Sequence, residues 1–141
     1  DEARMAGTVR RLSRASQDAT ERRLREIVTG VAASFGATAE LHYERGYPAL
    51  HNPADLYARV RDIAIGVVGA DRFVDLEVPG MGGEDFARYL HVIPGCFLLL
   101  GNGDEGPGSV MLHNSHYAYD DSISPTGAAL WVALAEAFLP K

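Results

Sequence analysis

Residues 7–45 have the sequence GTVRRLSRASQDATERRLREIVTGVAASFGATAELHYER, and this stretch decides the fold of the first part of the chain. Its first six residues alternate in a way that predicts a short strand over residues 7–12. Ser13 is a suitable N-cap for a helix that runs to about Phe35, where Gly36 can take the left-handed conformation that ends helices. Residues 39–45 alternate again and predict a second strand. Two strands alone need further partners to form a stable sheet.

Within the predicted helix, apolar side chains recur at helical spacing on one face. They are Leu24, Ile27, Val28, Val31, Ala32 and Phe35. The charged side chains fall mostly outside this face. We therefore expect the apolar face to pack in a core and not to bind a cofactor.

The rest of the chain predicts a mixture of helices and strands. Asn52 is a good N-cap and Pro53 suits the first helical position, so a helix follows and ends at Gly69. Its apolar residues recur at helical spacing and predict a buried face made of Leu56, Val60, Ile63, Ala64 and Val67. The later elements are predicted to be strands at residues 73–76 and 96–100, a helix at 84–90, a Gly-rich loop at 102–109, and a helix from Ser124 that buries Leu130, Trp131, Leu134, Ala135 and Phe138. This mixed order predicts an α/β or α+β fold.

Composition limits the class of protein. The chain has 141 residues, a formal net charge of −6 and one cysteine, Cys96, which we expect to be buried and not catalytic. The acidic balance argues against a nucleic-acid partner, because such a protein would need a basic face. No apolar run reaches the roughly 18 residues of a membrane span, so we expect a cytoplasmic protein without a membrane partner. The chain opens with Asp1, so we expect the native start to lie upstream.

Residues 112–121 hold the densest group of potential metal ligands. They include His113, His116, Asp120 and Asp121. Imidazole and carboxylate groups are the right ligand types for Zn²⁺, Mn²⁺ or Co²⁺. If the segment is extended, His113 and Asp121 share a face whereas His116 points away. The spacing alone leaves two interpretations of His113 open, a metal ligand or an ordinary polar residue of a loop.

Residues 79–86, PGMGGEDF, form the second candidate site. Glycines let a backbone approach a ligand closely, and the free N–H groups at a helix start favour an anion. The candidate substrate-binding residues are therefore Gly82, Gly83 and Glu84. The alternative is that Glu84 and Asp85 simply complement the dipole of the first helical turn.

Several short motifs occur in the order found in the second half of the M20 family of peptidases and amidohydrolases. In the first part of the chain these are GTVR at 7–10, ERRLREI at 21–27, FGA at 35–37 and RGYP at 45–48. The later motifs are MGGEDF at 81–86, PGCFLLLG at 94–101, LHN at 112–114 and PTGA at 125–128. The set covers nearly the whole chain, which resembles the branch that contains hippurate hydrolases and N-acyl amino acid amidohydrolases.

The resemblance implies two domains. Residues 1–50 would be the second half of a ferredoxin-like lid domain that commonly mediates dimerisation, so a homodimer is expected. Residues 51–141 would be the C-terminal part of a phosphorylase/hydrolase-like catalytic domain of α/β type.

The resemblance also implies roles for individual residues. His113 matches the family's last metal ligand, and Gly82 and Gly83 match a loop near the substrate pocket. Ser115 and Ala118 stand where proline and aspartate are common in the family. Neither is a ligand position, so the assignment does not depend on them.

The activity implied by the resemblance is hydrolysis of the amide bond of N-acyl amino acids or similar small conjugates, with two divalent ions (Zn²⁺, Mn²⁺ or Co²⁺). The family's other ligands and its general-base Glu belong to an N-terminal half that this chain does not contain. The chain therefore supplies at most one ligand and no catalytic residue. We expect it to be inactive alone and to need the missing half as a partner. The alternative is a non-catalytic module for self-association or binding.

Overall fold

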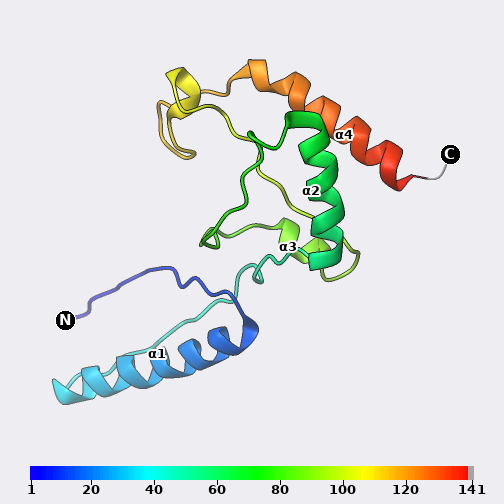
Figure 1. The fold of residues 1–141 in the computed structure, drawn as a ribbon. Coiled ribbons are helices and arrows are strands. Elements are labelled where there is room, and N and C mark those ends of the chain that lie inside the picture. Colours follow the sequence, from blue (N-terminus) through cyan, green and yellow to red (C-terminus); the bar gives the residue numbers. More distant parts are fainter. Residues whose placement is uncertain (140–141) are drawn as a thin grey trace. The chain divides into compact units, whose positions relative to one another are not determined.

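The computed structural model describes residues 1–139, and its regular elements in this range are helices (Figure 1). In chain order they are α1 (Arg14–Ser34), α2 (Ala54–Val68), α3 (Phe86–Tyr89), the 3-10 helices η1 (Gly106–Ser109) and η2 (Asp121–Ile123), and α4 (Ser124–Phe138). None of these helices is long and apolar enough to cross a membrane. The chain forms two compact units. The first comprises Asp1–His51 and Leu76–Pro94, and the second comprises Asn52–Asp75 and the chain from Gly95 onward.

No strand forms within residues 1–139, so the predicted α/β or α+β class is wrong. The ferredoxin-like half-lid and the α/β catalytic part are wrong for the same reason. The four segments concerned are residues 7–12, 39–45, 73–76 and 96–100. An alternating pattern, as in residues 7–12 and 39–45, or an apolar run, as in residues 96–100, is compatible with a strand, but a strand also needs a neighbour to pair with its backbone groups. In the described part of the chain these segments have no such neighbour.

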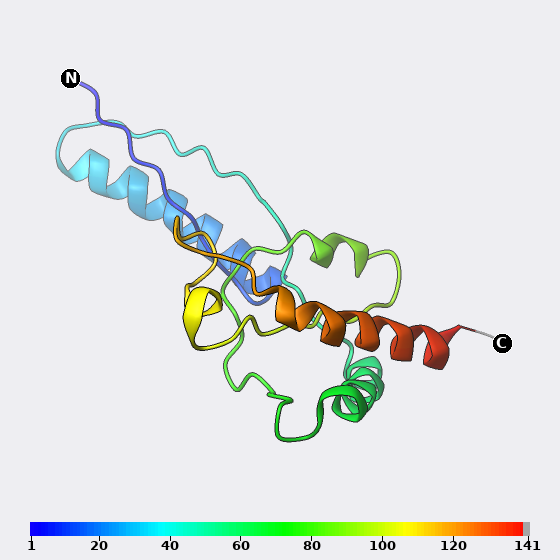
Figure 2. The same cartoon turned by 90° about the horizontal axis from the view of Figure 1, so that it is seen from above.

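Side chains of α1 hold the segments on either side of it. Residues 39–45 run back alongside α1 in both views (Figures 1 and 2). Arg25 Nη1 donates a hydrogen bond to Leu41 O at 3.2 Å. In the segment before α1, Arg11 Nε donates to Thr20 Oγ1 at 2.7 Å. Contacts with α1 therefore hold both segments, which were expected to be strands.

The ends of α1 follow the sequence signals closely. Ser13 has extended backbone dihedrals, and its Oγ accepts a hydrogen bond from Ser16 N at 3.1 Å. Gly36 has a φ of 70°, in the left-handed region that glycine adopts without a steric penalty. Its N–H donates to Ala33 O at 3.0 Å, which satisfies one of the carbonyls left over at the helix end. The predicted helix is confirmed at both ends.

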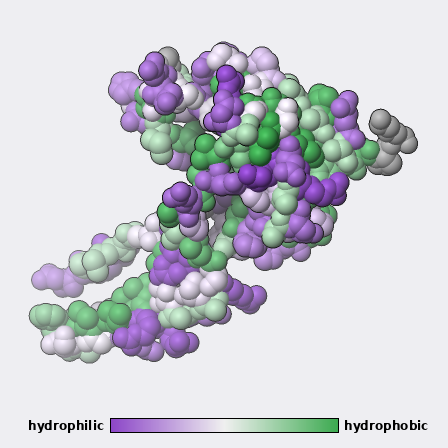
Figure 3. Space-filling view, in the orientation of Figure 1, coloured by the Kyte–Doolittle hydropathy of each residue, from purple (hydrophilic) through white to green (hydrophobic). Residues whose placement is uncertain are grey.

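The apolar face of α1 contains no buried residue, so the prediction that it packs in a core is wrong for the described residues: Leu24, Val28 and Ala32 are half-buried, and the other three are exposed. No residue of α1 is buried. Ile27 is 49% exposed, Val31 53% and Phe35 84%. Figure 3 shows hydrophobic surface along this helix. Single large apolar residues on a surface are normal, whereas a contiguous apolar patch is typical of a protein–protein contact.

The second unit has its core between two helices. α2 packs against α4, and Val60 and Ala64 on the inner face of α2 are buried. The guanidinium of Arg59 lies 4.4 Å from the centre of the Phe138 ring, which links the two helices further. The predicted inner face of α2 is confirmed. The predicted burial by α4 is wrong, because none of its residues is buried and Trp131 is 74% exposed.

Asn52 does not cap α2, contrary to the sequence prediction. The capping position is Pro53, without a side-chain cap. Instead, Asn52 Nδ2 donates to Phe97 O at 2.9 Å and Asn52 Oδ1 accepts from Phe97 N at 2.8 Å. An amide side chain carries one acceptor and two donors, so it can serve a backbone N–H and C=O together. Asn52 therefore ties the start of α2 to the segment that was expected to be a strand.

Candidate functional site

His113 lies at the third position of a tight turn in the second unit. Asn114 N donates to Met111 O at 3.2 Å and closes this turn. His113 has a φ of 69° and is the one non-glycine residue within residues 1–139 whose φ is positive. A positive φ at the third position is what a type II turn requires, and glycine or asparagine usually supplies it. Backbone strain of this kind clusters at functional sites, so the turn marks His113 as a candidate functional residue.

A second turn follows directly. Tyr117 N donates to Asn114 O at 3.0 Å, and His116 N donates to Asn114 Oδ1 at 2.9 Å. The segment is thus a pair of turns and not the extended chain assumed from the sequence. The expectation that His113 and Asp121 share a face therefore does not apply. The side chains of His113 and His116 are both exposed.

The donor groups present can be tested against a metal centre. Among residues 1–139, no three His, Cys, Asp or Glu side chains come together in a way that could hold an ion. A catalytic zinc site takes about three protein ligands and leaves one position open. The exposed His113 imidazole can offer one nitrogen. These residues therefore fit one ligand position and not a complete centre.

Asn102 joins the two ends of the segment that carries His113. Its Nδ2 donates to Ala118 O at 3.0 Å and its Oδ1 accepts from Asp120 N at 2.8 Å. Asn102 could not be recognised from the sequence, because its partners lie 16 and 18 residues away along the chain. Asp120 in turn accepts a hydrogen bond from Ser122 N at 2.9 Å. This hydrogen bond lowers the pKa of Asp120 and favours its charged form.

The second candidate site lies in the first unit, between residues 76 and 94. Gly82 is exposed, and a Cβ built on it would meet nothing within 4 Å. At Gly83 a Cβ would lie 2.9 Å from Nη1 of Arg10 and 3.7 Å from the Tyr47 ring, so a side chain there would displace the arginine. Glu84 Oε1 accepts a hydrogen bond from Phe86 N at 3.2 Å. Glu84 precedes α3 (Phe86–Tyr89), whose capping position is Asp85, and its side chain makes a local contact with the first N–H group of that helix.

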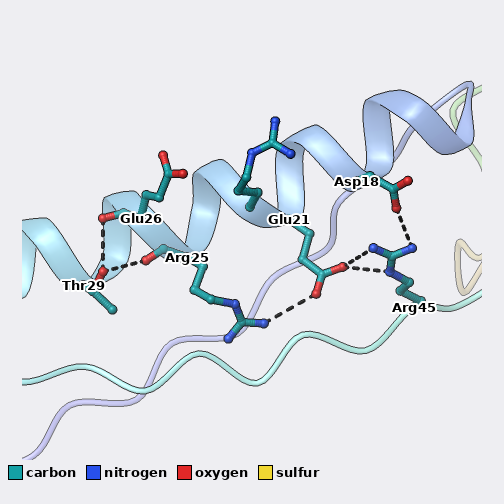
Figure 4. Close-up of a pocket in the computed structure, with 7 residues that line it drawn as sticks. Asp18, Glu21, Arg25, Glu26, Thr29 and Arg45 are labelled. Atoms are coloured by element: carbon teal, nitrogen blue, oxygen red, sulfur yellow. Dashed lines mark hydrogen bonds and ion pairs between the residues drawn. The ribbon is translucent and has the colours of Figure 1, made fainter.

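A surface hollow of about 570 Å³ lies along α1 (Figure 4). Arg45 Nη1 lies 2.7 Å from Asp18 Oδ1, and Arg45 Nη2 lies 2.7 Å from Glu21 Oε2. Arg25 Nη2 approaches the other oxygen of Glu21 at 3.5 Å. The hydrogen bonds to Glu21 and then to Asp18 raise the pKa of Arg45. These charges pair with one another, so the residues that carry them link α1 to the segment that follows it and are not free to bind a ligand.

The second unit contains one more polar contact that the sequence did not reveal. Tyr57 Oη donates to Asp75 Oδ1, and Arg61 Nε lies 3.2 Å from Asp75 Oδ2. The hydrogen bond from Tyr57, and then that from Arg61, lower the pKa of Asp75, while the same contact raises the pKa of Tyr57. Cys96 is half-buried, and burial raises the pKa of its thiol, which agrees with a structural role.

Comparison with known proteins places the chain in a family. Residues 5–137 match the model of peptidase family M20/M25/M40, so the chain belongs to that family. A Bacillus subtilis protein, YhaA, whose name assigns it to the amidohydrolases, is 37% identical over 85% of this chain and 30% of its own length. The IAA-amino acid hydrolase ILR1-like 6 of Arabidopsis thaliana is 31% identical over 96% of this chain and 30% of its own.

A third relative is the thermostable carboxypeptidase 1 of Saccharolobus solfataricus. It is 31% identical over 100% of this chain and 35% of its own length. The chain thus spans about a third of the length of the curated relatives it matches. No solved structure matches it. The family predicted from the short motifs is confirmed.

Proposed function

We propose that this chain is part of a hydrolase that cleaves the amide bond of N-acyl amino acids or similar small conjugates. The family match and the names of the relatives support this class, since they include an amidohydrolase, an amino acid hydrolase and a carboxypeptidase. The substrate is a small molecule with an amide or peptide bond beside an amino acid. The acyl group and the amino acid side chain are left open.

His113 is proposed to be the one metal ligand that this chain supplies. The observation that carries this role is its left-handed backbone, which is held in an exposed turn where glycine would be more stable. A neutral imidazole has one free nitrogen lone pair, which suits Zn²⁺, Mn²⁺ or Co²⁺. Polarisation of the scissile carbonyl, and a lowered pKa of the attacking water, are what two such ions supply when bound. The remaining ligands and a general base would come from outside this chain.

The glycine loop is proposed to contact the substrate. Gly82 has open space around it, so its backbone can be approached closely. Gly83 and Glu84 would then shape the loop, Gly83 by making room for Arg10 and Glu84 by accepting the hydrogen bond from Phe86 N.

The proposed domain roles are a lid for residues 1–50 and the end of a catalytic domain for residues 51–141. The structure groups residues 76–94 with the first unit, which a single boundary at residue 50 does not describe. A homodimer through the lid and a cytoplasmic location belong to the same proposal. The exposed face of α1 supports an association surface in residues 1–50.

A second candidate function rests on that same face. The chain alone could serve as a non-catalytic module that associates with itself, since it carries an exposed apolar stripe and an incomplete donor set. The two functions make opposite predictions for a metal-loaded protein of the relatives' length.

The deciding experiment is hydrolysis of a panel of N-acyl amino acids by that longer protein, with and without Zn²⁺ or Mn²⁺. We expect metal-dependent turnover that falls by orders of magnitude in His113→Ala and much less in His116→Ala. The 141-residue chain should show neither turnover nor tight metal binding, because one imidazole gives little affinity compared with a preformed site. Equal, small effects of the two substitutions would rule out the role proposed for His113.

A further inference from the structure

The segment between Asn102 and Ala118 is a loop that is closed at its neck by one side chain. Asn102 Oδ1 accepts a hydrogen bond from Asp120 N at 2.8 Å, and Asn102 Nδ2 donates one to Ala118 O at 3.0 Å. Two opposed hydrogen bonds from one planar group fix both the distance and the orientation of the chain across the neck. Asn102 is half-buried, so water competes less for these bonds than at an exposed site.

The first part of this loop folds back onto Asn102. The Nδ2 of Asn102 lies 3.4 Å from Gly108 O, and Gly108 is buried. A Cβ at Gly108 would lie 1.7 Å from Asn102 O, so only glycine allows the two backbones to approach this closely. The chain is therefore fixed at Gly108 and at Ala118, on either side of His113.

Packing does not hold the turn of His113 in place. Its neighbours Met111 and Leu112 are 80% and 62% exposed. A residue keeps an unfavourable backbone conformation only when its surroundings determine that conformation strongly. Apolar contacts do not supply this constraint. The hydrogen bonds from Asn114 N to Met111 O and from His116 N to Asn114 Oδ1 shape the turn locally, and the hydrogen bonds at the neck of the loop are what hold this pair of turns in place within the unit.

We propose that Asn102 is the positioning residue of His113: by closing the loop at Gly108, Ala118 and Asp120 it fixes the turn that presents the imidazole. This inference rests on the proposed function. Outer contacts that orient a metal-binding histidine typically change metal affinity about 10–100-fold when they are removed. Asn102 acts one step further out, through the backbone of the loop.

Asn52 provides a matched control within the same unit. It is also half-buried, and its side-chain amide also hydrogen-bonds to a backbone N–H and C=O, those of Phe97. Asn52→Ala and Asn102→Ala therefore remove the same kind of contact from different places. A loss of general stability should affect both variants, whereas a loss of loop geometry should affect only the second.

The test uses the protein of the relatives' length, with two readouts. The first is hydrogen exchange of peptides that cover residues 103–120, compared with peptides of α2 and α4. The second is the dissociation constant for Zn²⁺ measured by calorimetry. We expect Asn102→Ala to speed exchange in the loop by about tenfold or more, with the helices unchanged. We also expect it to weaken Zn²⁺ binding by about tenfold, the lower end of the range for a direct outer contact, whereas Asn52→Ala changes neither.

Asn102→Asp keeps the size of the side chain and the acceptor for Asp120 N, but it turns an oxygen toward Ala118 O. It should give the same loop-specific result, and it replaces Asn102→Ala if that variant does not fold. Equal losses of Zn²⁺ affinity in the Asn102 and Asn52 variants, or unchanged exchange in the loop, would overturn the inference. His113→Ala is measured alongside. If it leaves Zn²⁺ affinity unchanged, the proposed function fails, and the exchange readout still decides whether Asn102 fixes the loop.

Discussion

Replacing His113 by glycine should make the protein more stable and less active. The left-handed backbone costs an ordinary L-residue about 1–2 kcal/mol, and glycine avoids this cost. Glycine loses more backbone freedom on folding, which offsets about 0.5–1 kcal/mol of that gain. Because the φ of His113 is 69°, we expect His113→Gly to raise the free energy of unfolding by about 0.5–1 kcal/mol.

His113→Ala is the matched control. It removes the imidazole as glycine does, but it keeps the Cβ that makes a positive φ unfavourable. Histidine is enriched among residues with a positive φ, so alanine should be no better than histidine at this position. The expected order of stability is therefore glycine first, then histidine, then alanine at or slightly below histidine.

The measurement is urea unfolding followed by circular dichroism, in the presence of a chelator. Bound metal would stabilise the wild type and hide the effect of the backbone, because a ligand of the native state adds to its stability. The same substitutions are then made in a protein of the relatives' length, which is loaded with Zn²⁺ and assayed for amide hydrolysis beside its wild type. Glycine and alanine should both lose activity by orders of magnitude, although they differ in stability.

The reasoning fails if His113→Gly is less stable than His113→Ala in the chelator. That result would mean that the turn does not hold residue 113 in the left-handed region. High activity in His113→Gly would instead show that the imidazole has no role in the reaction, and it would not affect the prediction about backbone conformation and stability.

Three further outcomes are expected. Tyr57→Phe should lower the free energy of unfolding near neutral pH, and urea titrations should show its difference from the wild type shrinking below about pH 4. The lowered pKa of Asp75 stabilises the fold fully only above the ordinary value of 3.8, and this stabilisation is lost as the pH falls through the pKa of the folded state. A charge on the exposed face of α1, as in Val31→Glu, should reduce concentration-dependent association in sedimentation experiments, whereas Arg22→Glu on the same helix outside that face should not. The 141-residue chain should bind Zn²⁺ far more weakly than a protein of the relatives' length, and similar affinities in calorimetry would contradict the single-ligand assignment.

Local signals predicted the helices well. The Ser13 side chain caps the start of α1, and the left-handed backbone of Gly36 ends it. Both effects act within a few residues, so the local sequence is enough to locate that helix. The spacing of Val60 and Ala64 likewise identified the inner face of α2. Such features depend on contacts within a few residues along the chain.

Features that depend on distant partners were not predictable in this way. Residues 7–12 and 39–45 alternate as strands do, and residues 96–100 form the apolar run of a buried strand, but strand pairing requires a neighbour that the sequence pattern does not identify. Asn52 suits a helix cap and also suits a bridge between backbone groups, and only the position of Phe97 decides between the two. Asn102 looks like an ordinary residue of a Gly-rich loop until Ala118 and Asp120 are brought next to it.

The neck at Asn102 has a consequence for how the length of this loop can vary. The entropy of closing a flexible loop changes slowly with length, by about 0.6 kcal/mol for each doubling. An extra residue between Gly108 and His113 would therefore cost little stability, since the neck could still close. It would, however, move the turn along the chain and carry the imidazole away from its place. If His113 is the metal ligand proposed above, insertions and deletions in this stretch should be tolerated by folding but should lower activity, so the number of residues between Gly108 and His113 would itself be under functional constraint.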